Sequence, residues 1–197
     1  MRTNIFSRSV ITGLILLITS VTGSSFARDK AETIDATAMG TSTQMGRVGT
    51  VRIIIYDFST PEDRQILVEA FQKGQSDGLA NALGKMKAVG RIQIPGTVGY
   101  DLSFIRNIPT PTGRKIRFIT NRKIAFGENY WDTQSKSFNL TAGEINIDKE
   151  NKDKSGGVLY PATQLIINKD GELQFDLNQN PWKLTNIVDW QGTPGAN

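Results

Sequence analysis

The chain has 197 residues, with 23 Lys and Arg against 19 Asp and Glu and a formal net charge of +4. Hydrophobic residues make up 38% of the sequence, which is typical of one globular domain. Cysteine and histidine are absent, which excludes disulfide bonds, a thiol nucleophile, a Ser-His-Asp triad and the usual zinc, copper and haem sites. We therefore expect no cofactor and no metal, and assign no catalytic residue.

Residues 1–27 have the features of a secretory signal peptide. Two arginines precede an apolar run at residues 10–21, and the small residues Ser25 and Ala27 occupy the positions that a signal peptidase reads. The run is shorter than the roughly 20 residues of a spanning helix, which favours cleavage after Ala27 over an uncleaved anchor. We predict an exported protein, periplasmic or extracellular, with no membrane span in the mature chain.

Removal of the signal segment leaves 21 basic against 19 acidic residues, a net charge of +2. Because a nucleic-acid reader shows a concentrated basic face, no nucleic acid is expected as a partner. Residues 28–47 are small and polar without a recognised period, which predicts a flexible leader. A single domain then covers residues 48–190, and residues 191–197 form a flexible tail.

The strongest predicted strand covers residues 48–58 and is apolar on both faces from Ile53 onward, which is typical of a central strand. Thr60 and Pro61 then provide a cap and a first helical residue. Two apolar stripes at helical spacing follow, separated at Lys73 and Gly74. They predict a two-helix hairpin packed on the sheet.

The remainder of the domain has the pattern of short strands joined by turns. Candidate strands cover residues 91–94, 97–106, 115–126, 138–148, 158–168, 172–177 and 183–190. Short links between successive strands favour an antiparallel meander. The predicted fold class is α+β: a curved antiparallel sheet of about seven strands that can close partly into a barrel, with the two-helix hairpin inserted after the first strand.

The acidic residues suggest two kinds of site, a calcium loop and a catalytic carboxylate. Residues 151–157 resemble a calcium loop, but Lys152 and Lys154 oppose a divalent cation, so a solvated turn is favoured. Asp101 and Glu128 lie in apolar contexts where a carboxylate can serve as an acid or base. The favoured interpretation is that Asp101 points outward, or pairs with Arg106 or Arg122.

Tyr130 and Trp131 are the candidate contact residues. They are adjacent aromatics in a polar stretch, where they can stack on a ligand or partner. The alternative is that they cover the end of a core.

Four further segments carry a resemblance to a known family. They read MKAVGRI at 86–92, GTVGYDL at 96–102, GRKI at 113–116 and TNRKIAF at 120–126. Over about residues 46–190 the chain resembles a family of small exported bacterial hypothetical proteins without an assigned function. The resemblance implies a bacterial exported protein and supplies no activity, cofactor or functional residue.

The missing catalytic residue types favour a non-catalytic exported binding or interaction domain, for a small apolar ligand or a protein partner. A carboxylate-dependent hydrolase and a structural envelope protein are the alternatives. A ligand-binding version predicts an internal pocket of roughly 300 Å³ or more, lined by apolar strand residues. A filled interior would instead move the function to the outer surface.

Overall fold

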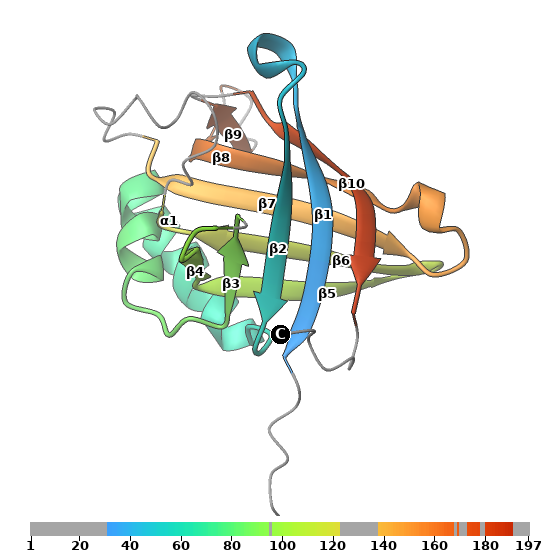
Figure 1. Ribbon diagram of the computed structural model, residues 1–197. Helices are drawn as coiled ribbons and strands as arrows, with labels where there is room; N and C mark the ends of the chain where they lie inside the picture. Colours follow the sequence, from blue (N-terminus) through green and yellow to red (C-terminus); the bar gives the residue numbers. More distant parts are fainter. Residues whose placement is uncertain are drawn as a thin grey trace, which may run out of the picture.

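The computed structural model describes residues 31–94, 96–122, 138–167, 169, 173–177 and 180–190. These residues form a sheet whose strands all pair antiparallel, together with one α-helical element and two 3₁₀ turns (Figure 1). In chain order, the elements are β1 Glu32–Gly40, η1 Ser42–Gln44, β2 Val48–Ile55, α1 Pro61–Leu83, β3 Gly90–Gln93, β4 Tyr100–Leu102, β5 Phe104–Thr110, β6 Gly113–Thr120, β7 Leu140–Asp148, η3 Lys152–Lys154, β8 Gly156–Ile167, β9 Leu173–Leu177 and β10 Trp182–Asp189. No helix within these ranges is both long enough and apolar enough to cross a membrane.

The sheet curls until it is nearly closed, like a barrel. Its strand order is β4-β3-β2-β1-β10-β8-β7-β6-β5, with β9 paired to the C-terminal part of β8. Strands β1, β2 and β3 cross β5 to β8 in Figure 1. The two outermost strands of the order, β4 and β5, are consecutive in the chain and separated only by Ser103. The hydroxyl of Thr120, at the end of β6, donates to the Asp101 carbonyl of β4 at 2.8 Å, which ties the two ends of the sheet together.

The core fills the space between the two halves of the sheet. Alternating residues of the strands point inward, as the two-residue period of a strand requires. The fully buried members include Ile34, Ile53, Ile116, Ile145 and Leu159. These side chains occupy the space in which an internal ligand pocket was expected, which leaves the outer surface of the sheet for a binding site.

The flexible leader predicted at residues 28–47 is wrong over most of its length. Strand β1 lies inside the sheet, between β2 and β10. Its buried residues Ile34, Ala36 and Ala38 alternate with polar residues that face outward. Alanine and threonine differ little in hydrophobicity, so the two-residue period of this segment is weak in the sequence.

Within the described residues the helical segments expected as a two-helix hairpin form a single kinked α-helical element, α1. It begins as predicted, with Thr60 as the cap and Pro61 as the first helical residue. The structure adds a capping box, in which the side chains of Thr60 and Asp63 each accept a hydrogen bond from the other residue's backbone N–H. Gly74 and Gln75 interrupt it with non-helical backbone angles, at the place where the first helix was expected to end. The pattern therefore located the break, which appears in α1 as a kink between two helical segments.

Helix α1 covers one end of the outer face of β5 to β8 (Figure 1). Its buried residues Leu67, Phe71 and Leu83 form a second apolar cluster with Phe104 of β5 and Leu140 of β7. The described residues of α1 do not cover the other end of the outer face of β5 to β8.

The described part of the chain contains ten strands, so the prediction of about seven was too low. One reason is β1. Another is that the predicted strand at residues 97–106 is divided at Ser103 into β4 and β5. This division allows one stretch of chain to pair with β3 and then with β6.

Candidate binding site

A groove of about 450 Å³ lies on the outer face of the sheet, beside the area that α1 covers. Most of its lining is apolar and comes from strands β5 to β9. The apolar residues are Phe104, Phe118, Ile119, Ala142, Val158, Tyr160 and Phe175.

Strand register builds the floor of this groove. Ile119 of β6 lies opposite Phe104 of β5 and Ala142 of β7, and Ala142 lies opposite Tyr160 of β8. Directly opposite residues of antiparallel strands point to the same face, so these four side chains form one row across the sheet. The small side chain of Ala142 in this row leaves depth between its larger neighbours.

The far end of the row is made by a pair of aromatic rings. Tyr160 and Phe175 of β9 lie with ring centroids 5.2 Å apart and a tilt of 31°. Phe175 is 38% exposed, whereas Phe104 at the helix end is buried. The groove is therefore deep at one end and open to solvent at the other.

Charged side chains form one rim of the groove. Glu144 of β7 accepts from Arg117 Nε at 2.6 Å and from Lys115 Nζ at 2.7 Å, and both cations belong to β6. Partial burial favours the protonated carboxyl of Glu144, but the hydrogen bonds and charges of Lys115 and Arg117 outweigh it and lower its pKa. Glu144 is thus held as an anion between two cations and is poorly suited to transfer protons.

Comparisons of the chain with protein-family models, curated proteins and solved structures found no match.

The predicted contact residues Tyr130 and Trp131 lie outside the described residues, as does Glu128. Their roles stay predictions. The groove itself was not predicted, because most of its residues are outward-facing positions spread over five different strands. The available signal was that outward positions such as Ile119 and Tyr160 are apolar, on a face where polar residues are the rule.

Asp101 points outward from β4, as favoured from the sequence. Its carboxylate forms an ion pair with Arg91 of the neighbouring strand β3 at 2.8 Å and is exposed. The partner is therefore Arg91, and the pairing with Arg106 or Arg122 suggested from the sequence is wrong. An exposed and paired carboxylate offers little support for a hydrolase.

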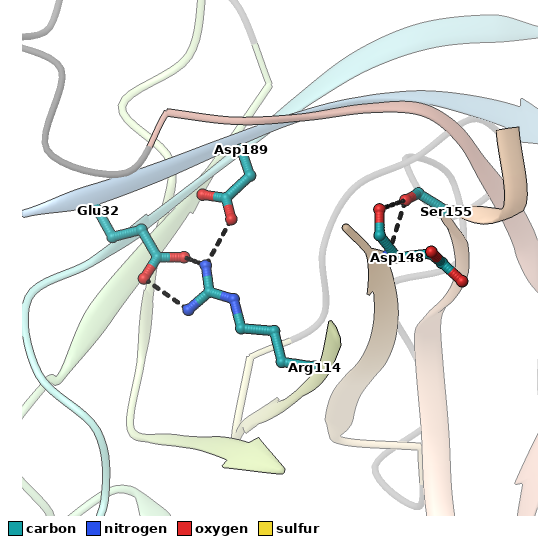
Figure 2. Close-up of polar contacts among 5 residues, drawn as sticks. All are labelled: Glu32, Arg114, Asp148, Ser155 and Asp189. Carbon is teal, nitrogen blue, oxygen red and sulfur yellow. Dashed lines mark hydrogen bonds and ion pairs between the residues drawn. The ribbon is translucent and has the colours of Figure 1, made fainter. Parts of the chain in front are cut away.

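A buried ionic cluster joins three strands at another part of the barrel (Figure 2). Arg114 of β6 donates to both oxygens of Glu32 at the start of β1, with Nη1 at 3.0 Å from Oε2, and to Oδ2 of Asp189 in β10 at 2.6 Å. Burial favours the neutral form of Arg114, but its bonds to the two carboxylates outweigh this effect and raise its pKa. The guanidinium binds both carboxylates, so the cluster links β6 to β1 and β10.

The segment weighed as a calcium loop contains a 3₁₀ turn, η3. Asp148 accepts from the backbone N–H groups of Glu150 and Asn151 at 3.0 and 2.8 Å, and from the Thr112 hydroxyl at 2.9 Å. These bonds, led by that from Asn151, lower the pKa of Asp148. Its backbone N–H in turn donates to the hydroxyl of Ser155 (Figure 2).

Inside the segment itself, the side-chain oxygen of Asn151 accepts from the Asp153 N–H at 3.0 Å, so this oxygen is used by the turn. Within the described ranges, no three acidic side chains gather as a metal site would require.

Proposed function

We propose that the protein is an exported, non-catalytic binding domain that holds the apolar part of a small ligand in the groove on the outer face of β5 to β8. The observation that carries this proposal is the apolar row of Phe104, Ile119, Ala142 and Tyr160, which lies beside the helix in a groove of about 450 Å³. Ligand pockets are commonly clefts of about 300–1,000 Å³ with a mostly apolar lining.

The charged groups of the groove favour binding over catalysis. The carboxylate among its described lining residues is Glu144, which Lys115 and Arg117 hold as an anion. A general acid or base is most effective when its pKa lies near the pH at which the protein works. A carboxylate with a lowered pKa and two cationic partners does not meet this requirement.

A neutral environment-sensitive dye, N-phenyl-1-naphthylamine, tests the proposal with the purified protein. We expect saturable fluorescence with the folded protein. Val158→Trp places a large ring in the groove and is expected to weaken dye binding about tenfold, since a filled site excludes the probe. Thr50→Trp is the matched control, because Thr50 is an exposed position of β2 on the other half of the sheet.

Two results would overturn the proposal. One is fluorescence that appears only when the protein unfolds. The other is equal dye affinity for Val158→Trp, Thr50→Trp and the unmodified protein while all three remain folded by circular dichroism.

A further inference from the structure

Positive charge exceeds negative charge along the rim of the groove. On the outer face, Arg106 of β5 lies directly opposite Arg117 of β6, which lies opposite Glu144 of β7. Lys115 precedes Arg117 by two positions on the same face and also reaches Glu144. The described residues of this rim therefore include three cations and one carboxylate.

The unpaired cation of this group is Arg106. It is exposed and forms no ion pair with any residue in the described ranges. Like charges placed directly opposite on neighbouring strands destabilise a sheet, so the Arg106–Arg117 arrangement costs stability in the free protein. A bound anion would remove this cost, because guanidinium groups donate several hydrogen bonds in a fixed plane to carboxylates and phosphates.

The cationic row borders the apolar row directly. Arg106 is two positions from Phe104, and Arg117 is two positions from Ile119, so the members of each pair share a face. Two residues of a strand span about 7 Å, which sets the separation between a bound anionic head and the start of the apolar floor. The floor then continues across the sheet toward Phe175.

Given the proposed function of the groove, on which this step rests, we propose that its ligand is a single-chain amphiphile with an anionic head. The carboxylate or phosphate head lies against Arg106 and Arg117, and the hydrocarbon chain follows the apolar row toward Tyr160 and Phe175. Charge complementarity selects the sign of the head, since the uncompensated charges of the rim are positive.

Competition against the bound neutral dye tests the head group with amphiphiles of one chain length. The probes are dodecanoate, dodecyl phosphate, dodecanol and dodecyltrimethylammonium, used below their micellar concentrations. We expect either anion to displace the dye at about tenfold lower concentration than dodecanol, and the cationic probe to be the weakest. The difference between anion and alcohol should shrink as salt is raised, because the rim is exposed.

Arg106→Gln supplies the matched variant. It should weaken binding of the anions about tenfold and leave dodecanol unchanged, because only the head contact is lost. It should also leave the melting temperature of the free protein equal or raise it, since the like-charge pair is removed. Arg91→Gln is the control, because Arg91 pairs with Asp101 on the other half of the sheet.

The outcomes separate this inference from the proposed function. Equal affinity for dodecanoate, dodecyl phosphate and dodecanol, or anion binding unchanged by Arg106→Gln, overturns the anionic head and leaves an apolar groove. Stronger binding of the cationic probe also overturns it. Failure of the neutral dye to bind the folded protein overturns the proposed function itself.

Discussion

Replacing Arg114 with methionine removes the cation that joins Glu32 and Asp189 (Figure 2). Methionine keeps much of the length of the side chain, so the main change is the loss of the guanidinium. The two carboxylates then remain near one another without the cation that holds them. We expect a large loss of stability from this single substitution.

The surroundings of the cluster set the size of the loss. The side chains of Arg114, Glu32 and Asp189 are 8%, 14% and 15% exposed, so water can replace little of the lost interaction. Removing one partner of a buried ion pair costs about 3–5 kcal/mol. In a domain of this size such a loss lowers the melting temperature by roughly 10 °C.

Arg52→Met is the matched control, because Arg52 forms an ion pair with Asp35 on the outer face. The Arg52 side chain is 47% exposed, and exposed pairs contribute about 0–1 kcal/mol. The triple replacement Glu32→Gln, Arg114→Met and Asp189→Asn should recover much of the loss, because it leaves no unpaired charge in the site.

Urea unfolding followed by tryptophan fluorescence measures these differences, with the buried Trp182 as a reporter inside the barrel. The pKa of Arg114 is raised by folding, so its contribution is fully present below the unfolded pKa of arginine and is lost only as pH rises through the folded pKa. The difference between the variant and the unmodified protein should therefore stay constant between pH 7 and pH 9. A loss below about 1 kcal/mol, or a triple variant no more stable than Arg114→Met, would refute the reasoning.

Four further outcomes are expected. Gly143→Ala should lower the unfolding free energy by about 1–3 kcal/mol, because a Cβ there overlaps the ring of Phe118, and a neutral result in urea would contradict this packing. Folding lowers the pKa of Asp148, so its contribution to stability is present above the unfolded pKa of about 4 and is lost as pH falls below it. Asp148→Asn should therefore flatten the decline in stability at acid pH, as followed by circular dichroism. An unchanged decline would argue against the turn's role. Thr60→Ala should cost about 1 kcal/mol in thermal unfolding through loss of the cap of α1, whereas an equal melting temperature would mean that the capping box contributes nothing. N-terminal sequencing of the protein recovered from its native host should begin at Arg28, and an intact N-terminus would disprove the predicted cleavage.

Local chemistry explains which elements were predictable. The strand that became β2 and the start of α1 at Thr60 carry strong signals over a few adjacent residues. Strand β1 has the period of a strand, but Ala36 and Ala38 bury little surface, so its place was fixed by pairing with distant strands. The division at Ser103 likewise depends on which strands lie on either side.

The candidate site was less predictable than the fold for the same reason. An outward apolar residue such as Ile119 acquires meaning only when the register places Phe104 and Ala142 beside it. Arg114 finds partners 82 and 75 positions away, which no local pattern can indicate. Tyr130 and Trp131, in contrast, were conspicuous locally and remain to be tested by mutation.

The pairing of β1 with β10 places the first and last described strands side by side within the sheet. Thr37 and Thr185, which face one another there, are 148 positions apart. Contacts of such separation slow folding, because a long loop must close before they form. Until β10 arrives, β1 presents an unpaired edge on which another chain can add a strand. We therefore expect the centre of the sheet to be completed late in folding, and loss of β10 to open the barrel at its middle.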